Sequence, residues 1–159
     1  MGTARDQLAR ADVVLCSACL FGFDCRYDAR DKRKPHVVEA LRGKPVVPVC
    51  PEMAGELGVP RPPADLFGGA GGAVLDGEAR VVTREGRDVT GAFLAGAALA
   101  LEAARRYGAA VAVLKEGSPS CGSRRVVVDG ASTVGMGVAA AALARAGVAL
   151  ISDEDLEQP

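Results

Sequence analysis

Tryptophan is absent from this 159-residue chain, and only two tyrosines and four phenylalanines supply aromatic side chains. Hydrophobic residues nevertheless make up 49% of the sequence, so the core has to be built mainly from alanine, valine and leucine. Such small side chains suit helices packed closely on a sheet. A chain of this length can bury a core without disulfides or a structural metal. The composition therefore favours one domain over residues 1–159.

A strong charge of either sign is also lacking, because 19 basic and 20 acidic residues give a formal net charge of −1. No global field attracts duplex nucleic acid or a membrane surface. The first residues are charged and contain no apolar segment typical of a secretory signal. No stretch reaches the roughly 18 to 20 apolar residues of a membrane-spanning helix. We therefore expect a cytoplasmic protein that binds neither duplex nucleic acid nor membranes; the sequence does not indicate its oligomeric state.

Cysteine is present five times, an odd number that fits a disulfide framework poorly. Three of the five lie within ten residues, at Cys16, Cys19 and Cys25, and the others are Cys50 and Cys121. Thiols stay reduced in the cytosol. We therefore expect these cysteines to act in chemistry or in metal binding rather than as covalent cross-links.

Short apolar segments alternate with helical ones along the chain. Strands separated by helices imply parallel pairing with right-handed crossovers, and two prolines indicate that the second strand is irregular or edge-like. We expect an α/β fold, a three-layer Rossmann-like domain with a mostly parallel sheet and an inserted β-hairpin. The expected hairpin joins residues 73–75 to 79–83 through Asp76-Gly77, after a long loop over 53–72. The other expected strands are 13–17, 45–49, 110–114, 125–128 and 148–151, and the helices are 3–11, 35–42, 90–107 and 135–146.

Three of the cysteines fall at the ends of expected strands. Cys19 follows the first strand, Cys50 ends the second, and Cys121 lies in the loop after the third. Ligands of open parallel sheets gather outside the carboxyl ends of the strands, so we expect these thiols to converge on one edge. Three thiolates leave one position open on a tetrahedral metal or on one iron of a cluster. Catalytic metal sites keep such open positions.

The remaining two thiols have different surroundings. Cys16 falls inside the first expected strand, where a free cysteine usually acts as a small buried hydrophobe. Cys25 lies six residues after Cys19 and could be a fourth ligand, a resolving thiol or a bystander, which we favour. The Cys-x-x-Cys spacing of Cys16 and Cys19 is weak evidence, because thioredoxin-like pairs both lie at a helix start. The paired spacings of zinc fingers and ferredoxins are missing.

Polar groups accompany two of the converging thiols. Glu52 is two residues from Cys50 and is a plausible general acid or base. Ser118 and Ser120 place two hydroxyl groups next to Cys121 in the loop after the third strand. These side chains are polar groups suited to chemistry at the expected thiol site.

Several other polar features are ambiguous. Arg26, Asp28 and Arg61 could hold a polar heterocycle or could form ion pairs that lock loops, and the sequence favours neither. The glycine-rich stretch 68–72 precedes the expected hairpin instead of opening a helix, which argues against a dinucleotide-binding loop. His36 follows a proline at an expected helix start, and we expect it to be exposed.

Four segments, in this order, resemble the small thiouracil-desulfidase family: "SACLFGFDCRYD" (17–28), "PVCPEMAGELGVPRPPAD" (48–65), "LKEGSPSCG" (114–122) and "GMGVAAAALARAGVALISDEDL" (135–156). The resemblance implies a [4Fe–4S] cluster held by three cysteines, here Cys19, Cys50 and Cys121. It also implies that the fourth iron is open and takes the sulfur from a thiolated base such as thiouracil. The product is then uracil, without net redox change.

The resemblance also assigns roles and shows two departures. It implies that Glu52 and Ser118 serve proton transfer and positioning, with Ser120 as the alternative hydroxyl. Asp28 is followed by Ala29 where the family usually has glycine, and residues 54–57 read "AGEL" where Gly-Gly-Leu is common. Both departures lie in loops that could shape the pocket, so they bear on substrate identity more than on cluster binding.

Three other functions remain compatible with the sequence. One is a non-catalytic zinc-binding protein that uses the same three thiols. Another is a sulfur carrier or redox sensor that uses Cys19 and Cys25 as a pair. A third is a cluster-dependent desulfurase that acts on a different thio-compound.

Overall fold

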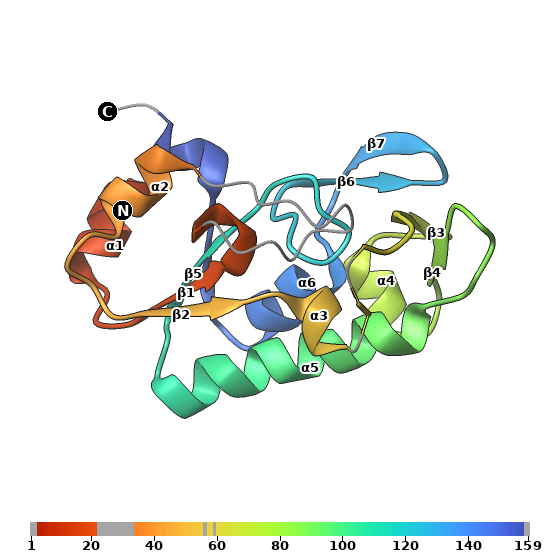
Figure 1. Ribbon diagram of the computed structural model, residues 1–159, viewed down its shortest axis with the longest axis horizontal. Coiled ribbons are helices and arrows are strands. Elements are labelled where there is room, and N and C mark those ends of the chain that lie inside the picture. Colours follow the sequence, from red (N-terminus) through yellow and green to blue (C-terminus); the bar gives the residue numbers. More distant parts are fainter. Residues whose placement is uncertain (1–2, 22–33, 56, 59, 158–159) are drawn as a thin grey trace.

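The computed structural model describes residues 3–21, 34–55, 57–58 and 60–157, and it contains two four-stranded sheets (Figure 1). The first sheet is parallel throughout and has the order β2 (Val46–Val49), β1 (Val14–Ser17), β5 (Val111–Leu114), β8 (Ala149–Ser152). The second is mixed and has the order β4 (Arg80–Thr83), β3 (Ala64–Phe67), β6 (Arg125–Val128), β7 (Ala131–Val134).

The four expected helices are present, with the ends shifted by a few residues in three of them. They are α1 (Ala4–Arg10), α2 (Pro35–Ala40), α5 (Thr90–Tyr107) and α6 (Val138–Arg145). Thr3 and Asp6 form a capping box that begins α1, and Gly108 ends α5 with a left-handed conformation, φ +70°. Four shorter elements complete the fold: η1 (Ala18–Phe21), α3 (Pro51–Ala54), α4 (Gly71–Leu75) and η2 (Asp153–Leu156).

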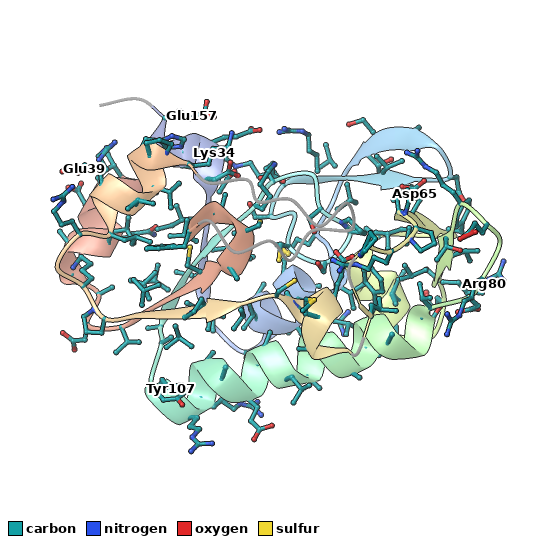
Figure 2. The ribbon with its side chains drawn as sticks, viewed as in Figure 1. Lys34, Glu39, Asp65, Arg80, Tyr107 and Glu157 are labelled. Carbon is teal, nitrogen blue, oxygen red and sulfur yellow. The ribbon has the colours of Figure 1, made fainter. Side chains whose placement is uncertain are left out.

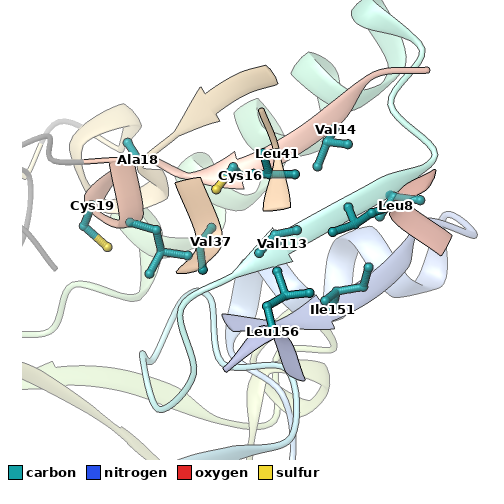
Figure 3. Close-up of a cluster of buried hydrophobic side chains, with 12 residues drawn as sticks. Leu8, Val14, Cys16, Ala18, Cys19, Val37, Leu41, Val113, Ile151 and Leu156 are labelled. Carbon is teal, nitrogen blue, oxygen red and sulfur yellow. The ribbon is translucent and has the colours of Figure 1, made fainter. Parts of the chain in front are cut away.

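The first sheet lies between two layers of helices, as expected for a three-layer fold. Val14 and Cys16 of β1 face the side covered by α1 and α2, where they join the cluster drawn in Figure 3. Leu15 and Leu114 face the opposite side and pack with residues of α5 and α6. Because both faces are covered, β1 is buried along its whole length. The mostly parallel α/β architecture is therefore confirmed.

Strand order determines where a site can form. The chain passes from β1 to the edge strand β2, and then returns to the other side of β1 to form β5. The position of β2 confirms that this proline-containing strand is an edge strand. The connections after β1 and β5 lead in opposite directions along the sheet, and ligands of open α/β sheets bind in the crevice outside such strand ends.

The expected hairpin over 73–83 is wrong. Residues 71–75 form the helix α4, and β4 pairs with β3, a strand inside the segment that we expected to be a loop. The Asp76-Gly77 pair ends a helix, with Gly77 at φ +79°. The argument that the glycine-rich stretch opens no helix is also wrong, because Gly71 begins α4. A true two-residue hairpin turn, Asp129-Gly130, connects β6 to β7, a strand that we did not expect.

Helix α5 runs beneath both sheets in Figure 1, while Figure 2 shows its Tyr107 and the Arg80 of β4 near opposite ends of the molecule. Helix α5 also supports α3, the short helix after Cys50. Within the described residues, no helix combines the length and apolar character needed to span a membrane.

Replacing Gly96 by alanine is expected to destabilise the protein by about 1–3 kcal/mol, as overpacking does in a dense core. A Cβ at Gly96 would lie 2.0 Å from the carbonyl oxygen of Pro51, the first residue of α3. Gly91, on the same helix, has open space around it. The control Gly91→Ala should keep or raise the free energy of unfolding, by up to about 1 kcal/mol. Equal urea midpoints for the two variants would contradict this close contact.

Candidate active site

A pocket of about 270 Å³ lies at the carboxyl ends of β1, β2 and β5. Cys19, Cys50 and Cys121 all line it, although they lie on three separate segments of the chain. The structure thus brings together the three thiols that strand order led us to expect at one edge. Whether they ligate a metal or a cluster is a separate question of chemistry.

Each thiol is positioned by a different local structure. Cys19 belongs to η1, is 7% exposed and lies at the end of the buried cluster in Figure 3. Cys50 precedes α3 as its N-cap residue and is half-buried. Cys121 is 5% exposed in the loop between β5 and β6. Cys16 is fully buried in β1, as expected for a structural thiol. All four of these cysteines are free of disulfides.

Two hydroxyl groups contact the Cys121 thiol. Burial raises the pKa of the Cys121 thiol to about 12, although its contacts with the Ser17 and Ser120 hydroxyls act in the opposite direction. The Ser17 hydroxyl also accepts a hydrogen bond from the backbone N–H of Lys115, at 3.0 Å. Ser17 therefore connects the end of β1 with the start of the loop that carries Cys121. A thiol in this setting needs a positive partner before it becomes a thiolate, and a metal centre supplies one.

Glu52 lies on the wall of the pocket, between an arginine and a serine. Arg61 Nε donates to Glu52 Oε1 at 3.0 Å, and both side chains are largely buried. Ser120 Oγ donates to Glu52 Oε2 at 3.2 Å. Ser118 Oγ is 3.1 Å from Ser120 Oγ. The two candidate hydroxyls and the candidate acid/base therefore form one chain of contacts.

The direction of this chain follows from the number of acceptor positions on Ser118. Its hydroxyl oxygen accepts the backbone N–H of Ser120 at 3.2 Å and of Cys121 at 3.1 Å. A hydroxyl has two acceptor positions and one hydrogen, so the hydrogen of Ser118 is left to donate to Ser120. Ser120 then donates its own hydrogen to Glu52. The hydrogen bonds run from Ser118 through Ser120 to the carboxylate.

Of the residues that we considered for substrate binding, the structure places two at the pocket. Ser120 and Arg61 line the pocket, but Arg61 also contacts Glu52 and the carbonyl oxygen of Gly58, at 3.0 Å each. This arrangement resembles the loop-locking ion pair more than a free substrate contact. Arg26 and Asp28 lie outside the described residues, as does Cys25.

The expected exposure of His36 is wrong. The residue is half-buried, and its Nε2 lies 3.1 Å from the carbonyl oxygen of Asp153. The proline before it begins α2 as expected, but the side chain turns toward η2. This contact joins two segments more than a hundred residues apart, so local sequence gives no signal for it.

Sequence analysis gave no role to Glu116, although the residue stands within the motif around Cys121. It is 2% exposed and lines the same pocket. Burial by itself raises the pKa of this carboxyl, but hydrogen bonds from Arg124, Arg125, Ser152 and Ser123 outweigh burial and lower it to about 2. Glu116 is therefore a buried anion at neutral pH. The sequence feature that could have drawn attention to Glu116 is a glutamate directly before Gly117, in a loop that follows a strand.

The donor set at the pocket suits a cluster. Within the part of the chain that the structure describes, no three His, Cys, Asp or Glu side chains are grouped closely enough for one metal ion. Thiolates on a single tetrahedral zinc lie about 3.8 Å apart, given Zn–S bonds of about 2.3 Å. A four-iron cluster binds each cysteine through a different iron and so accepts a wider spacing. Cys19, Cys50 and Cys121 supply the three thiolates that such a cluster needs, and all three line the pocket.

Comparisons with known proteins match nearly the whole chain. A family model described as 2-thiouracil desulfurase matches residues 14–155. The Bacillus subtilis (strain 168) protein YbbK, itself described as uncharacterised, is 40% identical over 147 residues, which cover 91% of this chain and 97% of YbbK. A solved structure of TudS, described as a [4Fe–4S]-dependent thiouracil desulfidase, superposes with a TM-score of 0.77 at 40% identity. That match covers 91% of this chain and 93% of TudS.

Proposed function

This chain belongs to the 2-thiouracil desulfurase family, and on that basis we propose that it is a [4Fe–4S]-dependent enzyme that removes sulfur from a thiolated nucleobase such as thiouracil. The observation that carries the proposal is the meeting of Cys19, Cys50 and Cys121 at one pocket beside Glu52. The reaction converts thiouracil and water into uracil and hydrogen sulfide. One C=S bond is replaced by one C=O bond, and no electrons are gained or lost.

We assign the three cysteines as the cluster ligands, which leaves one iron without a protein ligand. When bound, the cluster would supply that iron as a soft Lewis acid for the thiocarbonyl sulfur. Pro51, next to Cys50, is held against Gly96 of α5, so the strand-end thiol and the following Glu52 are placed by the same close packing. The protein's part is then to position the base and to move protons.

Glu52 is the base that takes a proton from the attacking water. Its contact with Arg61 fixes the orientation of the carboxylate. Ser120 and Ser118 extend this carboxylate into a line of hydroxyls that passes close to Cys121, since Ser120 Oγ is 3.8 Å from Cys121 Sγ. Both protons of the water finally reside on the departing sulfide. The reaction therefore needs groups that take protons from the water and groups that deliver protons to the sulfide. A line of hydroxyls ending at a carboxylate can do both.

The setting of the site also supports a small-molecule substrate in the cytoplasm. The thiol pocket also presents polar side chains, Arg61, Glu52 and Ser120, to a small polar molecule. Its thiols carry no disulfides, and free thiols persist in reducing compartments. The substrate is therefore proposed to be a free thiolated base that diffuses to the pocket.

The test is the metal content and product balance of protein purified without oxygen. We expect about four irons and four acid-labile sulfides per chain, and equal amounts of uracil and sulfide formed from thiouracil. About one zinc per chain with no sulfide would contradict the proposal and favour a zinc protein. A full cluster that leaves thiouracil unchanged but desulfurates another thio-compound would correct the substrate and keep the cofactor.

A further inference from the structure

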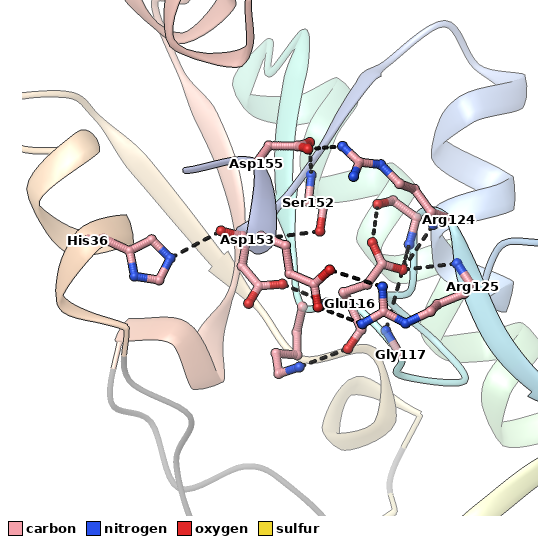
Figure 4. A network of polar contacts seen from close by, with 11 residues as sticks. His36, Glu116, Gly117, Arg124, Arg125, Ser152, Asp153 and Asp155 are labelled. Atoms are coloured by element: carbon pink, nitrogen blue, oxygen red, sulfur yellow. Dashed lines mark hydrogen bonds and ion pairs between the residues drawn. The ribbon is translucent and has the colours of Figure 1, made fainter. Parts of the chain in front are cut away.

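Glu116 is the centre of a buried polar network next to the pocket, drawn in Figure 4. Its Oε1 accepts backbone N–H groups from both ends of the loop between β5 and β6. The distances are 3.4 Å from Gly117, 3.1 Å from Ser123, 2.9 Å from Arg124 and 3.1 Å from Arg125. Its Oε2 accepts the Ser123 hydroxyl at 2.9 Å. One carboxylate thus closes the loop on itself.

The backbone of Glu116 is anchored as well. Its N–H donates to Asp153 Oδ1 at 2.8 Å, and Asp153 is itself 1% exposed in η2. The carbonyl oxygen of Glu116 accepts the Lys115 ammonium at 2.8 Å. Main chain and side chain of Glu116 are therefore both fixed, and the loop is tied to the C-terminal element of the fold.

The residues enclosed by these contacts are the ones that the proposed reaction needs. Ser118, Ser120 and Cys121 all lie between Gly117 and Ser123, the first and last parts of the loop that Glu116 holds. The far side of the loop is fixed by α6, where Val138 N–H donates to Pro119 and Ala140 N–H to Ser120. Glu116 and α6 therefore determine together where the two hydroxyls and the thiol point.

We propose that Glu116 is a positioning residue for desulfuration: its buried carboxylate holds the Ser118–Ser120 hydroxyl line in register with Glu52. The kinetic part of this inference rests on the proposed function, whereas the structural part does not. A charged acceptor is required because hydrogen bonds to an ionised group are about twice as strong as neutral ones. A single oxygen that accepts several N–H groups depends on that extra strength.

The test compares Glu116→Gln with Glu154→Gln in protein carrying its cluster. Glutamine keeps the shape of the side chain and removes its charge. Glu154 is the matched control, because its carboxylate binds the Arg125 side chain at 2.9 and 2.5 Å but none of the loop N–H groups. Ser123→Ala, which removes one donor to Glu116, is a second and milder variant.

In Glu116→Gln we expect amide hydrogen exchange over residues 117–125 to be about tenfold faster or more, with exchange in α5 unchanged. We also expect kcat to fall by about tenfold or more and KM to stay within about twofold, because the hydroxyls must be aligned in the transition state. Iron per chain should stay at the wild-type level. Ser123→Ala should show the same pattern at smaller size.

Unchanged exchange over 117–125 in Glu116→Gln would overturn the inference, and so would an equal loss of kcat in Glu154→Gln. A fall in the kcat of Glu116→Gln that is no larger than the fraction of unfolded protein in the sample would also overturn it. If the wild-type protein has no activity on thiouracil, the proposed function fails. The exchange experiment then still decides whether Glu116 holds the loop.

Discussion

Replacing Cys121 by alanine is expected to reduce bound iron to background and to lower desulfuration at least about a hundredfold, whereas Cys16→Ala should leave both near the wild-type level. Loss of an outer partner of a metal ligand costs about 10- to 100-fold, and loss of the ligand itself should cost no less. Both cysteines are buried, so the two variants remove the same atom from similar surroundings. Of these two cysteines, Cys121 lines the pocket and Cys16 does not.

The comparison separates ligation from packing. Cys16 belongs to the core cluster on the α1 and α2 side of the first sheet, and its loss leaves a small void there. Cys121 lies against Ser17 and Ser120 at the pocket, so its loss removes one of three anchors. Iron and sulfide analysis with the visible absorption spectrum checks the outcome. A Cys121→Ala protein with a full cluster would contradict the ligand assignment, and loss of iron in Cys16→Ala would point to a packing effect.

The long-range architecture could be predicted because its elements carry strong local patterns. A buried run such as 13–17 reads as a strand, and α5 combines a long apolar series with a glycine stop at Gly108. The strand at 79–83 was expected and is β4, but residues 64–75 could not be predicted in the same way. The strand β3 and the helix α4 are four and five residues long. Their conformations are settled by pairing with β4 and by the close approach of Gly71 to Gly137 in space.

The candidate site likewise has one part that the sequence could predict and one part that it could not. The meeting of three thiols follows from a rule about strand ends, so sequence order was enough to predict it. The Arg61–Glu52 pair and the contacts of Glu116 are set by how loops fold back on themselves. In each of these two sets of contacts, the path of the backbone determines which groups meet. The spacing rules for helices and strands do not apply to such loops. This is why Arg61 remained ambiguous and why Glu116 received no role.

Replacing Glu52 by glutamine is expected to lower kcat by about 10²- to 10⁴-fold, the range typical of a general acid or base, while the cluster stays intact. The amide keeps an oxygen for Arg61 but cannot take a proton from water at neutral pH. Iron per chain and the absorption spectrum should match the wild-type protein. Glu85→Gln is the control, because Glu85 lines the cavity next to Glu52 but is exposed and lies outside the thiol pocket. Full activity in Glu52→Gln would show that this role is wrong.

Ser120→Ala then decides whether Glu52 acts alone or through the hydroxyl line. Ser120 bridges Glu52 and Ser118, so its removal should also lower kcat, and the double variant should be no slower than the worse single one. Groups that act as a unit show such non-additive losses. If the losses multiply instead, Glu52 and Ser120 act in separate steps. If Ser120→Ala keeps the wild-type kcat, Glu52 takes the proton from water directly, and the hydroxyl line serves only to hold the loop.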